Sequence, residues 1–101
     1  MLKDLERVTR DLDGKTVVGE LDGYQVIVES RLFPDARGFQ LTIEKSAELI
    51  ESSICLTPGE AWKIIQYVVE HGHSTLRLKW RRLGLSEKTI KRMLDEWGEE
   101  Y

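Results

Sequence analysis

The sequence predicts an α+β protein in which helices and strands occupy separate parts of the chain. A helical stripe comes first, β-branched and alternating runs follow, and three helical patterns complete the chain. Because elements of one kind are grouped, we expect an N-terminal helix, an antiparallel meander of three or four strands, and then three helices. The 101 residues would divide into a helix-plus-sheet module, 1–56, and a three-helix module, 57–101, sharing one core.

The first helix and the first hairpin follow from local patterns. Residues 1–12 place leucine and valine at three- and four-residue spacings, which predicts a helix with one buried stripe. The β-rich runs 15–21 and 24–30 are separated only by Asp22-Gly23. Because this dipeptide accepts the positive φ angles of a two-residue turn, the two runs predict a β-hairpin.

The rest of the sheet is less uniform in pattern. Residues 39–44 alternate apolar and polar side chains, so they predict a strand with one buried and one solvent-facing side. Residues 46–53 fit either a helical turn or the start of a strand that continues into residues 54–56. The number of strands therefore stays open between three and four.

A capping pattern marks the first helix after the sheet. Residues 57–60 read Thr-Pro-Gly-Glu, which is typical of a helix start. Threonine can accept from free backbone N–H groups, proline suits the first turn, and glutamate can complete a capping box. We expect this helix to end at Gly72.

Two shorter helices are expected beyond that glycine. Ser74 or Thr75 would cap the first of them, and Ser86 would cap the second. Gly84 would allow the sharp turn between the two. Apolar side chains would clamp the pair together, and these are Leu76, Leu83, Ile90 and Leu94.

Charge is distributed unevenly along the chain. Residues 1–73 contain 8 Lys/Arg and 13 Asp/Glu, whereas residues 75–92 contain 7 Lys/Arg and a single acidic residue, Glu87. Affinity for phosphate follows the local patch rather than the total charge, so the basic segment is a candidate for nucleic-acid binding despite the acidic whole. The alternative is a solvated helix face that is balanced by carboxylates elsewhere.

Turn, cap and apolar positions recur at familiar spacings in residues 70–97, EHGHSTLRLKWRRLGLSEKTIKRMLDEW. The positions concerned are Gly72, Thr75-Leu76, Leu83-Gly84-Leu85-Ser86, Thr89-Ile90, Arg92 and Leu94. In them the segment resembles the trihelical helix-turn-helix DNA-binding domain of bacterial and archaeal transcription regulators. It departs from that family at Lys79 and Trp80, where a leucine and a small residue are usual, so the helices would have to repack there.

The resemblance implies a small DNA-binding regulatory protein whose last helix enters the major groove of duplex DNA. The residues expected at the interface are Arg77, Arg81, Arg82, Ser86, Lys88, Lys91 and Arg92. Lys88, Lys91 and Arg92 would address the groove, and the other arginines would bind the phosphate backbone. The sheet module would support a homodimer, because two half-sites multiply a modest affinity.

Two other functions remain open. The acidic balance of residues 1–73 favours a protein-interaction adaptor or inhibitor whose sheet docks onto a basic partner. Alternatively, the strand meander followed by ICLTPGEAW resembles the four-strand-plus-helix modules of coactivator-type single-stranded-DNA-binding proteins. In that case the carboxylates Glu20, Asp22, Glu29 and Glu44 would oppose an electrostatic groove for the strand.

No residue pattern indicates catalysis, a metal or another cofactor. His71 and His73 flank a glycine at a helix end, and the single cysteine, Cys55, stands in an apolar strand-like run. One cysteine cannot form an intrachain disulfide, and no apolar run approaches the roughly 20 residues that span a bilayer. The charged first residues also lack a signal-peptide segment. We therefore expect a cytoplasmic protein that is neither an enzyme nor bound to a membrane.

Overall fold

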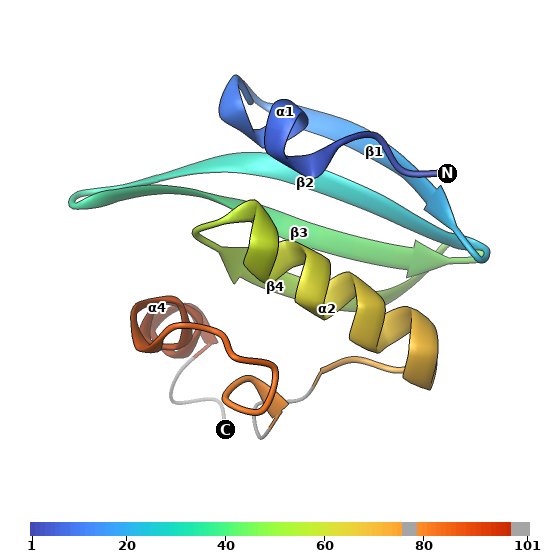
Figure 1. Cartoon of the computed structure of the whole chain (residues 1–101). Coiled ribbons are helices and arrows are strands. Elements are labelled where there is room, and N and C mark those ends of the chain that lie inside the picture. The colour runs from blue at the N-terminus through green and yellow to red at the C-terminus, as the bar shows by residue number, and fades with distance from the viewer. Residues whose placement is uncertain (76–78, 98–101) are drawn as a thin grey trace.

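A four-stranded antiparallel sheet in the order β1-β2-β3-β4 organises the chain (Figure 1). The computed structural model describes residues 1–75 and 79–97. In chain order the elements within these ranges are α1 (Leu5–Arg10), β1 (Lys15–Leu21), β2 (Tyr24–Phe33), β3 (Ala36–Lys45), β4 (Glu48–Cys55), α2 (Pro58–His71) and α4 (Glu87–Trp97). The predicted α+β class is confirmed.

The strand connections show why the meander forms. Asp22 and Gly23 have φ angles of 49° and 85°, so the predicted tight turn between β1 and β2 is confirmed. The ambiguous segment resolves into a turn, where Ser46 and Ala47 also have positive φ, followed by the fourth strand. The sheet therefore has four strands.

The N-terminal helix is shorter than the periodicity predicts. It begins only at Leu5, after Asp4, whose side chain accepts from the backbone N–H of Glu6 at 3.0 Å. Before it, Leu2 forms an antiparallel bridge with Gly19, so the first residues pair with the edge of β1. The prediction of a helix from residue 1 is wrong because the strand edge offers these residues backbone hydrogen bonds.

Gly19 is the position that permits this pairing. It lies at a bulge in β1 with φ +146°, and a Cβ atom there would lie 2.3 Å from the carbonyl oxygen of Met1. We expect Gly19→Ala to destabilise the protein by about 3 kcal/mol, because backbone strain and displacement of the N-terminal segment add together. Urea unfolding measures the change. Gly14→Ala is the control, since Gly14 also has positive φ but its added Cβ would meet nothing within 4 Å; equal losses would contradict the steric explanation.

The predicted three-helix C-terminal segment is wrong. Among the described residues, only α2 and α4 follow the sheet as helices, and residues 80–84, which the prediction placed in the middle helix, form a turn. Gly84, with φ 82°, ends this turn; the backbone N–H of Gly84 bonds to the carbonyl of Arg81 at 3.1 Å and that of Leu85 to the carbonyl of Trp80 at 3.2 Å. Leu76, expected in the apolar clamp, lies outside the described residues.

Thr75 and Trp80 are held by contacts with the sheet and with each other. The backbone N–H of Thr75, expected to cap a helix, donates to the buried carboxylate of Glu51 on β4 at 2.6 Å. The Trp80 indole N–H donates to the Thr75 hydroxyl at 3.0 Å, and both side chains are buried. The tryptophan that departs from the helix-turn-helix pattern thus packs toward the sheet.

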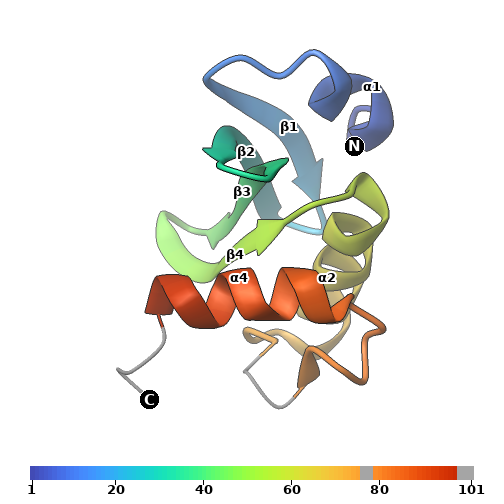
Figure 2. The ribbon, with the colours of Figure 1, turned by 90° about the vertical axis from the view of Figure 1, so that its left-hand side faces the viewer.

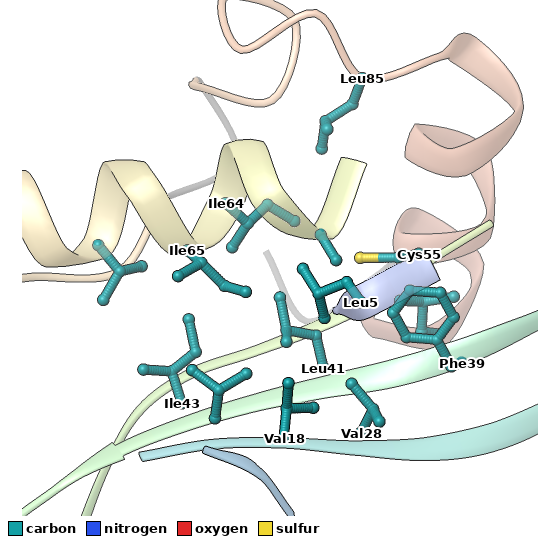
Figure 3. Packing of buried hydrophobic residues seen from close by; sticks show 14 of the residues in the cluster. Leu5, Val18, Val28, Phe39, Leu41, Ile43, Cys55, Ile64, Ile65 and Leu85 are labelled. Carbon is teal, nitrogen blue, oxygen red and sulfur yellow. The ribbon is translucent and has the colours of Figure 1, made fainter. Parts of the chain in front are cut away.

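One hydrophobic core lies between a face of the sheet and helices α1 and α2 (Figure 3). The strands contribute alternate residues such as Val28, Leu41 and Ile43, and α2 contributes Ile64 and Ile65, all buried. The remaining buried members include Leu85 in the turn before α4 and Ile90 and Met93 on α4. Residues from both 1–56 and 57–101 therefore belong to the same cluster.

Helix α4 runs alongside β4, as Figure 2 shows from the side. None of the helices in the described part of the chain has the length and apolar character needed to cross a membrane. Thus the sheet is covered on its core face by α1 and α2, while α4 occupies the β4 side and carries Lys88, Lys91 and Arg92.

Candidate nucleic-acid interface

Helix α4 presents one side to the core and another to solvent. Thr89, Ile90 and Met93 are buried, whereas Lys88 and Lys91 are exposed. The buried positions recur at three- and four-residue spacing, so packing fixes which side of the helix faces outward. The two lysines predicted to contact a groove are therefore on the open side.

The start of α4 is anchored by a carboxylate from α2. Glu60 is only 6% exposed, and its carboxylate accepts from the backbone N–H of Ser86 at 2.9 Å and from the hydroxyl of Thr89 at 2.7 Å. It also accepts from the backbone N–H of Leu56 at 3.3 Å. Because one buried carboxylate joins the starts of both helices, α4 has a fixed position relative to α2.

The predicted caps of α2 and α4 are confirmed. The backbone N–H of Glu60 donates to the Thr57 hydroxyl at 3.2 Å, and that of Thr89 donates to the Ser86 hydroxyl at 3.2 Å. Ser86, expected at the interface, thus serves the helix start. Sequence reasoning placed Glu60 in a capping box but missed its bonds to α4, for which no local pattern gives a signal.

Four predicted interface residues form what we call the cationic surface, namely Arg81, Arg82, Lys88 and Lys91, and all are exposed. The arginines precede α4 and the lysines lie in its first half. Arg81 forms an ion pair with Glu87 in the first turn of α4, which brings the arginine beside that helix. Arg77 lies outside the described residues.

Arg92 differs from the other predicted residues because it is engaged within the protein. Its side chain is 18% exposed and forms an ion pair with Asp35 at the turn between β2 and β3. Its guanidinium also lies 4.6 Å from the centre of the Phe33 ring. Arg92 therefore joins α4 to the β2–β3 hairpin, a contact between residues far apart in sequence that no local pattern predicts.

The face of the sheet opposite the core carries the opposite charge. Strand register places Glu20 beside Gln25, and Gln25 beside Glu44, in one row across three strands. Glu29 lies on the same face, four residues along β2 from Gln25, with Lys15 beside it on β1 and Arg31 two residues further along β2. Because the three carboxylates outnumber these two cations, we call this the acidic sheet face and expect nucleic acid on the α4 side of the molecule.

The single cysteine, Cys55, is buried in the core. Cys55 has no solvent exposure, and burial, followed by the nearby carboxylates of Glu60 and Glu51, raises the pKa of its thiol well above the ordinary value. The thiol is therefore kept neutral. His71 stacks on Tyr67 with ring centroids 4.1 Å apart, and the described residues include no group of three or more His, Cys, Asp or Glu suited to a metal ion.

Comparisons with known proteins give no relative to which this site can be matched. The sequence matches no protein-family model and no curated protein, and the fold matches no solved structure.

Proposed function

We propose that the protein binds duplex DNA through the cationic surface formed by Arg81, Arg82, Lys88 and Lys91. The observation that carries this proposal is the placement of these four exposed cations around the start of one firmly packed helix. A cation fixed on a rigid element loses little conformational freedom when it meets a phosphate. The carboxylates of the acidic sheet face also favour an approach of DNA from the α4 side.

Duplex DNA is favoured over a single strand by shape. An α-helix with its side chains is about 10–12 Å across and fits a major groove about 12 Å wide. A single strand would need aromatic side chains on a basic sheet surface, whereas the acidic sheet face carries Glu20, Glu29 and Glu44. A regulatory role, a homodimer and a cytoplasmic location remain predictions from the sequence.

Salt-dependent binding tests the proposal. Fluorescence anisotropy of labelled duplex and single-stranded oligonucleotides would be measured at several salt concentrations. Four phosphate contacts predict that log K for the duplex falls with log salt with a slope of roughly −3 to −4. Absence of duplex binding at low salt, or binding without salt dependence, would contradict the proposal.

A second function is favoured by one observation on the acidic sheet face. Val17 and Leu49 are 48% and 58% exposed there, beside the carboxylate row. Exposed apolar groups among like charges are typical of a surface that docks a basic protein partner. Capture of a partner that survives loss of the cationic surface but fails after Glu20→Lys with Glu29→Lys would support this adaptor function.

A further inference from the structure

A cleft separates α4 from the turn that joins β2 and β3. It has a volume of about 260 Å³ and is lined by Pro34, Asp35, Lys88, Lys91, Arg92 and Asp95. In Figure 1, the β2–β3 turn and α4 lie at the same end of the molecule. Three cations from one side of α4 thus face a short acidic turn.

The cations in the cleft differ in how they are used. Among the described residues, neither Lys88 nor Lys91 has an ion-pair partner, whereas Arg92 is paired with Asp35. Asp95 adds one carboxylate to the lining of the cleft. The result is an anion site in which one guanidinium already binds a carboxylate and two ammonium groups are uncommitted.

We propose that this cleft binds a phosphate group, which takes the place of the Asp35 carboxylate on Arg92 and is shared with Lys88 and Lys91. A guanidinium binds phosphate oxygens bidentately, and lysines add point charges beside it. Asp35 is 62% exposed, so its carboxylate can return to water at little cost. The Phe33 ring keeps the guanidinium in position during the exchange.

The inference rests on the proposed function where the phosphate belongs to DNA, but the cleft can be tested without DNA. Asp35 acts as an internal competitor, so its removal should strengthen phosphate binding. We expect Asp35→Asn to raise the affinity for inorganic phosphate about 3- to 10-fold. Its affinity for duplex DNA should rise by a similar factor with the salt slope unchanged, because Arg92 contacts the phosphate in both proteins and only the competing carboxylate is removed.

The experiment is an NMR titration of the labelled full chain with inorganic phosphate at constant ionic strength. Backbone signals of residues 34–35 and 88–92 should shift, and shift at lower phosphate concentration in Asp35→Asn. Glu96→Gln is the matched control, because it removes one negative charge from α4 and the ion pair with Arg31, but Glu96 does not line the cleft. Lys88→Gln, at an exposed position, should weaken binding without altering the fold.

The outcomes separate this inference from the proposed function. Shifts confined to the cleft and strengthened only by Asp35→Asn support a phosphate site; if duplex DNA then fails to bind, the ligand is a free phosphate compound and the proposed function is wrong. Absence of phosphate-induced shifts in the cleft would overturn the inference, even where duplex DNA binds. Equal behaviour of Asp35→Asn and Glu96→Gln would also overturn it.

Discussion

Replacing Glu60 with alanine is expected to destabilise the protein by about 3–5 kcal/mol, more than any other single substitution considered. The change removes the acceptor for the buried Thr89 hydroxyl and for the partly buried backbone N–H groups of Ser86 and Leu56. Hydrogen bonds to a charged group contribute roughly 1.5–3 kcal/mol each, and loss of a capping box about 1 kcal/mol. Several such losses at one site do not add fully, which gives the stated range.

Urea unfolding followed by circular dichroism measures this loss. Glu70→Ala is the matched control, since Glu70 is an exposed glutamate on the same helix. Glu60→Gln, which keeps one oxygen acceptor, should lie between the two. A loss below about 1 kcal/mol for Glu60→Ala would show that the anchor between α2 and α4 contributes little.

Reversing charge at Lys88 and Lys91 is expected to have the largest effect on binding. Lys88→Glu with Lys91→Glu should lower the affinity for duplex DNA at least about 100-fold near 0.1 M salt, because two phosphate contacts are lost and two repulsive charges are introduced. Both side chains are exposed, so the fold should be unaffected. Anisotropy measures the affinity, and circular dichroism checks the fold.

The control for this variant carries the same change of net charge elsewhere. Lys3→Glu with Arg7→Glu alters two exposed cations, one before α1 and the other on α1. It should reduce affinity only by the small amount expected from overall charge. Similar losses in both variants would mean that net charge, rather than the cationic surface, governs binding.

Local sequence signals predict the elements whose determinants are local. The Asp22-Gly23 turn needs positive φ at two adjacent residues, and the caps at Thr57 and Ser86 need only a hydroxyl before a helix. The structure confirms this turn and these two caps, because each depends on only a few neighbouring residues. The α+β class follows from the same local patterns.

The errors in the fold arise where distant contacts compete with local preference. Leu2 has a place in the apolar helical stripe, yet it pairs with Gly19 at a strand edge. Thr75, expected only as a helix cap, also binds β4 through the hydrogen bond from its backbone N–H to Glu51. The spacing of apolar residues along the chain predicts local secondary structure only. It therefore cannot predict the contacts that Leu2 and Thr75 make with the sheet.

In the candidate site, too, some features follow from local sequence and others depend on distant contacts. The exposure of Lys88 and Lys91 follows from helical spacing, since Ile90, Met93 and Leu94 mark the apolar side of the helix. The engagement of Arg92 by Asp35 and Phe33 depends on where the β2–β3 hairpin lies, which the sequence of α4 does not encode locally. Long-range packing thus decides which cations remain free.

Mapping of the DNA contact surface tests the central claim most directly. Isotope-labelled protein would be titrated with an unlabelled duplex oligonucleotide at low salt, and NMR signal changes would be assigned to residues. We predict that changes concentrate on Arg81, Arg82, Lys88 and Lys91, while Glu20 and Glu44 are unaffected. Changes centred on the acidic sheet face, or none at any residue, would contradict DNA binding through α4.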